Sequence, residues 1–379
     1  MNLTAMSLAI LMAVAGSGGA TRASTATAST TASTTASTAA STTAIAAVAA
    51  EADWILTAIA DDGAIALTPA QDVVVPYDAN IAAWSLARAA AVTRDPRYAA
   101  AAWRWLDWFA ARQDPFTGIV TNHVRDAEGW RATGEVDATD SVAATHMIAL
   151  GELVAATGDV VRLQRALPAM RRSMNALAIT HDRTDGLYYA LPGYEWKYTM
   201  DQAEVAAGLR AAAWMAWLGG RWGDAAEAAV AAAEAQAAVE QLWSGATGAY
   251  DWGKHRDGTR AKTAWWRWYP SATAQAWTVL FGVARADRVG AMMSELERNH
   301  PNWDRPEAMT FNDTGGQPVG YWPLAGVALA RAGSALRALE GAHRIRAAAD
   351  AAGRVYPFTP AAAGGLILLF AEPSVLALS

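Results

Sequence analysis

The chain has 379 residues, of which 53% are hydrophobic and 17% are charged, and its formal net charge is −6. This composition supports a large helical core, and the lack of any basic block or stripe argues against nucleic acid as the main partner. Because the sequence contains no cysteine, it has neither a disulfide framework nor a thiolate for metal binding or nucleophilic attack.

The first 44 residues have the pattern of an export signal and a linker. Residues 1–23 contain an apolar core followed by small residues, which is typical of a secretory signal peptide. Residues 24–44 are almost entirely Ser, Thr and Ala, so they cannot bury a core and are expected to form a disordered linker. We therefore expect a secreted or periplasmic protein with no integral membrane segment in its mature form.

Residues 45–379 repeat one signal roughly every 50–70 residues. A helical stretch ends, a turn marked by glycine leads into an extended aromatic or aliphatic segment, and a second apolar helix follows. Clear turns of this kind contain Gly118, Gly186 and Gly248. The predicted helices cover residues 45–60, 79–93, 96–112, 140–157, 159–179, 202–219, 222–242, 271–283, 285–298, 319–332, 334–351 and 361–370.

These helices alternate in character along the chain. Segments 159–179 and 334–351 keep a charged face, as outer helices do, whereas segments 141–151, 205–218 and 322–330 are nearly uncharged on all sides. Six helical hairpins with this alternation predict an all-α (α/α)6 barrel, which is a single domain with an inner and an outer ring. We expect this domain to be a monomer.

The connections between the predicted helices differ in length. Those leading from an inner to an outer helix are short, and those leading from an outer to an inner helix are long and aromatic. Since the hairpins are in register, all the long loops gather over the N-termini of the inner helices. Long irregular loops in a compact domain are usually functional, so this end is predicted to hold the binding cleft.

Four carboxylates lie at the starts of two predicted inner helices. Asp140 and Asp201 are one repeat apart, and Asp137 and Glu204 accompany them. Neighbouring packed helices are about 8–10 Å apart, close to the roughly 6.5–9.5 Å that separates the two carboxyl groups of an inverting glycosidase. This spacing predicts Asp140 and Asp201 as an acid/base pair that Asp137 and Glu204 tune or replace. The alternative for each of these residues is helix capping.

The sequence Ala138-Thr139-Asp140-Ser141 resembles the A-T-D signature of bacterial endo-glucanases and chitosanases, which belong to the six-hairpin glycosidase superfamily. The resemblance implies an (α/α)6 barrel with glycosidase activity and places Asp140 in its catalytic centre. Two departures from the family pattern stand out. Val142 occupies the position of a second Asp, and Asp78 or Asn80 stands where the general-acid Glu is expected.

Aromatic residues are concentrated in the predicted long loops of a chain that has 18 Trp. Flat indole and phenol rings stack on the apolar faces of sugars, so these side chains are predicted to bind substrate. The predicted substrate-binding residues are Trp130, Trp196, Tyr198, Trp252, Trp265, Trp266 and Trp268, with the polar residues Asn80, Asn122 and His123. The histidines are scattered and no cofactor motif is present, so neither a metal nor a cofactor is expected.

Together these patterns predict a secreted glycoside hydrolase that acts on a poly- or oligosaccharide, with inversion. A polysaccharide lyase is the second hypothesis, in which Tyr198, His123 or His255 is the base and Lys197 neutralises a uronate. A catalytically inactive carbohydrate-binding protein is the third. A carbohydrate is the expected partner in all three.

Overall fold

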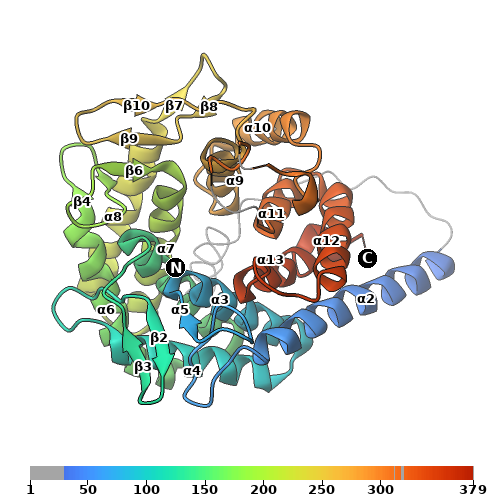
Figure 1. Cartoon of the computed structure of the whole chain (residues 1–379), viewed down its shortest axis with the longest axis horizontal. Coiled ribbons are helices and arrows are strands. Elements are labelled where there is room, and N and C mark those ends of the chain that lie inside the picture. Colours follow the sequence, from blue (N-terminus) through green and yellow to red (C-terminus); the bar gives the residue numbers. More distant parts are fainter. Residues whose placement is uncertain (1–29, 311, 317–319, 379) are drawn as a thin grey trace, which may run out of the picture.

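The computed structural model describes residues 30–310, 312–316 and 320–378, and the predicted signal peptide lies outside them. Two concentric rings of helices form the fold (Figure 1). Each helix of the inner ring packs against the next, and the last closes on the first: α3 (Pro76–Thr93), α5 (Thr139–Thr157), α7 (Thr199–Leu218), α9 (Thr273–Leu280), α11 (Pro323–Arg331) and α13 (Pro360–Phe370). This confirms the predicted all-α (α/α)6 barrel.

Each inner helix has an outer partner that shields it from solvent. The outer helices are α2 (Thr30–Leu56), α4 (Pro96–Arg112), α6 (Val160–Thr180), α8 (Trp222–Glu240), α10 (Ala286–Asn299) and α12 (Ala335–Ala351), and the short α14 (Pro373–Leu376) follows α13. Burial follows the charge pattern of the sequence. Helix α5 buries most of its side chains, whereas α10 buries only Met292, Met293 and Leu296. In the described part of the chain, no helix is long and apolar enough to cross a membrane.

Helix α2 begins earlier than the sequence pattern predicts. It starts at Thr30, so it includes residues 30–44, which the sequence assigns to a linker. Alanine, which recurs through this stretch, has the highest helix propensity of all residues. Packing onto the barrel is seen from Ala44, which is 4% exposed.

The short connections have a local cause at each end. Arg94 and Gly158 adopt left-handed backbone angles that end α3 and α5. The side chains of Asp95 and Asp159 then accept backbone N–H groups of the next helix and begin α4 and α6. These tight turns leave all the long connections at the opposite end of the barrel.

Four of the six long connections contain small sheets among the described residues. One sheet has the antiparallel order β1 (Val73–Val74), β2 (His123–Asp126), β3 (Gly129–Ala132), and another has the order β10 (Arg260–Ala261), β9 (Gly253–His255), β6 (Trp196–Tyr198). Two hairpins pair β4 (His181–Asp182) with β5 (Leu187–Tyr188) and β7 (Trp243–Ser244) with β8 (Ala249–Tyr250). A π-helical turn, η1 (Trp268–Ala272), leads into α9, and a 3₁₀ turn, η2 (Pro306–Ala308), lies in the loop before α11. Strand β3 carries Trp130, and strand β6 carries Trp196 and Tyr198.

Candidate active site

Acidic residues gather at the N-terminal ends of three consecutive inner helices. Asp78 lies in the first turn of α3, Asp140 in the first turn of α5 and Asp201 in the first turn of α7. Glu204 lies three residues after Asp201, and Asp137 two residues before the start of α5. We call these five residues the carboxyl cluster.

A close contact between α5 and α7 sets the position of the cluster. Ala144 and Gly208 face each other one turn below the carboxyl groups, and a Cβ atom at Gly208 would lie only 2.8 Å from the backbone of Ala144. Further along, a Cβ atom at Gly151 would lie 3.2 Å from the Cβ of Ala211. Small residues therefore let the two helices approach closely and bring Asp140 towards Asp201 and Glu204.

The deepest members of the cluster are shielded from water. Asp140 is 0% exposed, Glu204 is 1% exposed and Asp201 is 8% exposed. Burial raises the pKa of Asp140 and Asp201 well above the usual range, and repulsion within the cluster adds to this effect. Burial likewise raises the pKa of Glu204 to about 7. The cluster therefore retains protons at a pH where isolated carboxyl groups have lost them.

The two remaining members lie nearer the solvent. Burial raises the pKa of Asp78 to about 6, although a hydrogen bond from the Thr359 hydroxyl to its Oδ1, 3.1 Å long, opposes the shift. Asp137 is exposed, yet protein surrounds it closely enough for burial to raise its pKa. Asp137 also raises the pKa of Asp78, Asp140 and Asp201 by charge repulsion, so the cluster extends from the barrel interior to the surface.

Glu204 is held by donors from two other helices. Its Oε1 accepts hydrogen bonds from the Tyr77 hydroxyl of α3 at 2.7 Å and from the Trp277 indole N–H of α9 at 2.9 Å. Its Oε2 is buried and has no hydrogen-bond partner among the described residues. One oxygen is therefore fixed, whereas the other has the Ser141 hydroxyl nearby, which favours the charged form of Glu204.

Asp140 and Asp201 do not occupy the capping positions of their helices. The N-cap residues of α5 and α7 are Ala138 and Tyr198. The Oδ1 of Asp140 accepts the N–H of Ser141 at 2.8 Å, whereas its Oδ2 is buried without a partner among the described residues. Only one oxygen of the Asp140 carboxyl group, Oδ1, therefore supports the end of α5.

Tyrosine side chains border the cluster on the α7 and α9 side. Burial is the largest cause that raises the pKa of Tyr198 and Tyr269, and the charge of Asp201 raises both further. Tyr198 continues into a row of stacked rings, since it lies 5.8 Å from Trp252, which lies 5.3 Å from Trp196. The predicted residues Trp196, Tyr198 and Trp252 therefore form one aromatic row that begins beside Asp201.

Several predicted binding residues have other environments. Asn80 is 0% exposed, donates to the Val142 carbonyl and the Thr145 hydroxyl, and accepts the indole N–H of Trp105. It therefore ties α3 to α4 and α5 inside the barrel wall. Trp268 is 0% exposed and packs against His300 and Trp322, so no substrate can reach its ring without rearrangement.

The other aromatic residues of the loop before η1 are more accessible. Trp265 is half-buried and donates its indole N–H to the Thr247 carbonyl at 3.1 Å. Trp266 is 58% exposed, and the Arg267 guanidinium lies over its ring. No contact of these two rings with the carboxyl cluster is found in the described part of the chain.

The predicted residues of the loop between α4 and α5 lie together. His123 is 5% exposed, its Nδ1 is 2.8 Å from the Thr121 carbonyl, and its ring packs edge-on against Trp108. Asn122 is half-buried and pairs through its backbone with Thr133 and Glu135. Trp130 faces Trp108 on the outer helix α4. These residues build a surface separate from the carboxyl cluster.

Sequence reasoning missed Tyr77, Tyr269 and Trp277, which contact or border the cluster. The signal for Tyr77 was its place in the first turn of an inner helix, the same criterion that selected Asp140 and Asp201, whereas Tyr269 lies in η1, just before α9. Trp277 lies within a helix and was assigned to packing. In the described residues, no group of three His, Asp or Glu side chains is arranged to hold a metal ion.

Comparison with known proteins gives matches in structure and none in sequence. No protein-family model matches the sequence, and no curated protein does. A wild-type glycosidase has a TM-score of 0.62 and 16% identity, covering 89% of this chain and 98% of its own. A variant described as a glycosidase in complex with glucose has a TM-score of 0.61 and 15% identity, with the same coverage.

A rhamnosidase from Klebsiella oxytoca with rhamnose bound is also similar, with a TM-score of 0.55 and 14% identity. The match covers 86% of this chain and 63% of the rhamnosidase. An uncharacterized conserved protein from Thermus thermophilus has a TM-score of 0.60 and 12% identity, covering 86% of this chain and 99% of its own. At such low identities the likeness is one of fold, and the fold is the helical barrel of known glycosidases.

Proposed function

We propose that the protein is a glycoside hydrolase that cleaves a poly- or oligosaccharide with inversion at the anomeric carbon. The observation that carries this proposal is the carboxyl cluster, in which neighbouring inner helices present buried carboxyl groups with raised pKa values. Glycoside hydrolysis needs one carboxylic acid that keeps its proton and one carboxylate that activates water. A cluster of like charges supplies both states, because its members cannot all ionise together.

Within the cluster, Asp140 is the acid and Asp201 the base. Asp140 is the more deeply buried of the two, and both burial and the charge of Glu204 favour its protonated form. Asp201 retains some exposure, so it is better placed to reach a water molecule. Their positions on adjacent packed helices favour the roughly 6.5–9.5 Å separation of inverting enzymes over the roughly 5 Å of retaining ones.

The ion pairs of Lys197 argue against the lyase hypothesis, in which this lysine is the cationic group. Lys197 is 1% exposed, and its ammonium group lies 2.5 Å from Asp182 and 2.8 Å from Asp185. Two buried ion pairs leave this lysine unable to neutralise a uronate. The ring of His255, the last residue of β9, pairs with both Glu195 and Asp257. Tyr198 lies beside the cluster, and this position fits a residue that lines the site of a hydrolase as well as it fits the base of a lyase.

Substrates with different leaving groups test the two roles. The native protein is first screened against polysaccharides for release of reducing ends. Asp140→Asn and Asp201→Asn are then assayed on an accepted glycan and on its 2,4-dinitrophenyl glycoside, which needs no proton on the leaving group. Asp140→Asn should reduce the turnover rate roughly 10²–10⁴-fold on the glycan and much less on the activated glycoside. Asp201→Asn should reduce the turnover rate on both substrates.

Asp126→Asn, an exposed change on β2, is the matched control and should keep normal turnover. The anomer first released, followed by proton NMR, checks inversion. Near-normal hydrolysis of the glycan by either cluster variant would remove that residue from the reaction. A native protein that binds glycans but hydrolyses none would support the non-catalytic alternative.

The proposal includes export, with residues 1–23 as the signal peptide. This rests on the apolar core and small-residue end of that segment. The N-terminal sequence of the protein recovered from its native host tests it directly. A mature chain that still begins at Met1 would refute it.

A further inference from the structure

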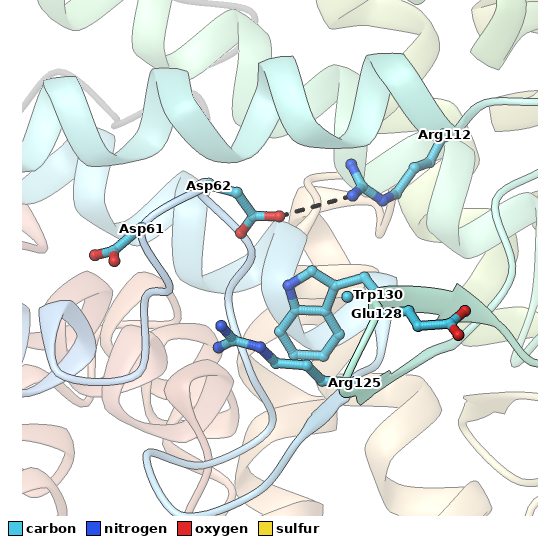
Figure 2. Close-up of a pocket in the computed structure, with 7 residues that line it drawn as sticks. Asp61, Asp62, Arg112, Arg125, Glu128 and Trp130 are labelled. Carbon is cyan, nitrogen blue, oxygen red and sulfur yellow. Dashed lines mark ion pairs between the residues drawn. The ribbon is translucent and has the colours of Figure 1, made fainter.

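An open pocket of about 410 Å³ lies outside the carboxyl cluster, at the edge of the long-loop end (Figure 2). Three parts of the chain form it: the loop after α2, the end of α4 and the hairpin of β2 and β3. Its lining residues are Asp61, Asp62, Arg112, Arg125, Glu128, Gly129 and Trp130. Small-molecule sites commonly measure roughly 300–1,000 Å³, so this volume is sufficient for a ligand.

The aromatic wall of the pocket is fixed by its neighbours. Trp130 packs edge-on against Trp108, with ring centroids 6.3 Å apart and an interplanar angle of 89°. The Trp108 indole N–H donates to Asp62 at 3.1 Å, and the Arg112 guanidinium lies 3.7 Å over the Trp108 ring. Arg112 also pairs with Asp62 at 3.7 Å. Trp130 is therefore supported from behind and half-exposed in front.

The polar groups around Trp130 include both donors and acceptors. Arg125 lies 5.7 Å over the Trp130 ring (Figure 2), and among the described residues its guanidinium has neither a hydrogen bond nor an ion pair. The Asp61 and Glu128 carboxylates likewise have no side-chain partner in the described ranges. Sugar hydroxyls both donate and accept hydrogen bonds, so mixed groups around a flat ring fit them.

The charge of the pocket selects among sugars. Three carboxylates and two guanidinium groups line it, so negative charge exceeds positive by one. Since Arg112 is already paired with Asp62, only Arg125 is available to an anion, with Asp61 and Glu128 opposing it. A uronate or a phosphate is therefore disfavoured relative to an uncharged ring.

We propose that this pocket is a second carbohydrate-binding site that holds one neutral sugar ring of a glycan chain on Trp130. It opens at the same end of the barrel as the carboxyl cluster, so it can retain a glycan near the cluster. Binding here does not depend on hydrolysis, and the proposal stands or falls separately from the proposed function.

A binding experiment tests the site without relying on turnover. Native protein and the Asp201→Asn variant are applied to a printed array of neutral and uronic-acid oligosaccharides, and the affinity for the best neutral glycan is measured by calorimetry. We expect neutral chains to be bound in both backgrounds. Trp130→Ala should weaken that affinity by about tenfold or more, as removal of a buried aromatic contact does.

Trp222→Ala is the matched control, because Trp222 is 63% exposed and begins α8 at the short-loop end. It should change the affinity by less than about twofold. Arg125→Ala leaves the aromatic wall in place and should weaken binding by a smaller factor, which covers the case in which Trp130→Ala unfolds. Unchanged affinity in folded Trp130→Ala and in Arg125→Ala, a preference for uronic acids, or no neutral glycan bound would each overturn the proposal.

Discussion

At the scale of single residues, Glu204 combines a buried carboxyl group with two fixed donors. Its pKa of about 7, against 4.5 for a free Glu, means that the folded state binds a proton that the unfolded state releases between these values. The contribution of Glu204 to stability is therefore fully present below about pH 4.5 and is lost as the pH rises through 7. Asp78, with a pKa of about 6, acts in the same direction.

Glu204→Gln should remove this part of the pH dependence. A neutral Gln still accepts the hydrogen bonds from Tyr77 and Trp277 and has no charge to bury. Relative to the native protein, the variant should gain about 3 kcal/mol of unfolding free energy between pH 4.5 and pH 8. Urea unfolding across this range measures the difference. Glu340→Gln on the exposed face of α12 should leave the curve unchanged, and parallel curves for Glu204→Gln and native protein would contradict the argument.

Tyr77→Phe should raise the pKa of Glu204 further. The Tyr77 hydroxyl donates to the Glu204 carboxyl group and stabilises its charged form, so losing that donor favours the proton. We expect an upward shift of about one unit, followed by carbon-detected NMR titration of the Glu side chains. Tyr98→Phe, whose hydroxyl lies near Ala49 and Asp53 in the outer ring, serves as control. A downward shift or none in Tyr77→Phe would show that the Tyr77 hydroxyl does not stabilise the carboxylate.

Residue positions could be predicted where the repeat defined them. Asp140 and Asp201 are one period apart, and the repeat alone places both at the same end of adjacent helices. The environment of Asn80 could not be predicted, because the direction of a side chain on an inner helix depends on how its neighbours pack. The partners of Glu204 are 127 and 73 residues away in sequence, at separations that no local pattern encodes.

At the scale of elements, the contact between α5 and α7 determines the geometry of the cluster. Gly208→Ala should separate these helices, since its Cβ would lie 2.8 Å from the Ala144 backbone, which cannot move aside as a flexible side chain does. We expect a loss of roughly 1–3 kcal/mol in stability, measured by urea unfolding. Any glycan turnover should fall as well, because the spacing of Asp140 and Asp201 changes.

Gly290→Ala is the matched control for that change. Gly290 lies inside α10, and an added Cβ there meets no atom within 4 Å. Alanine should be neutral or stabilise the helix by up to about 1 kcal/mol. Equal effects at positions 208 and 290 would mean that helix propensity, and not the contact between α5 and α7, decides the outcome.

Helices were easier to predict than strands for a physical reason. Inner and outer helices differ in charge over 8 residues or more, and over 18 to 20 residues in α3, α5 and α7, which leaves a long signal in the sequence. The strands are two to four residues long, so an alternating pattern barely begins before the strand ends. Their pairing also joins distant segments, as Val73 with Val124 and Trp196 with His255 do.

At the scale of the whole molecule, an ion-pair group joins the first hairpin to the last. Glu51 of α2 is 0% exposed, and its carboxylate pairs with Arg346 of α12 at 3.1 Å and with Arg354 at 2.7 Å. Because α2 also packs against α13, these contacts close the outer ring. A buried carboxylate depends on its partners, since unpaired charge in the interior is costly.

Arg354→Met should therefore destabilise the whole barrel. Arg346 remains to pair with Glu51, so we expect a loss of about 3 kcal/mol, at the lower end for a broken buried pair. Arg97→Met removes an exposed pair with Asp95 and Asp53 and should cost less than about 1 kcal/mol. Thermal unfolding of both variants compares the two costs. A loss for Arg354→Met no larger than for Arg97→Met would show that the closure contact is not important for stability.

The closed ring also allows the chain to start at a different hairpin while the cyclic order of the hairpins stays the same. The carboxyl cluster needs α3, α5 and α7 side by side, but ring packing places α13 beside α3 in the same way that it places α5 beside α3. A circularly permuted chain, opened at the short connection of residues 219–221 and joined between the last and first hairpins, keeps every inner-ring neighbour. The hairpin at which the chain starts can therefore change without moving the helices whose carboxyl groups form the cluster.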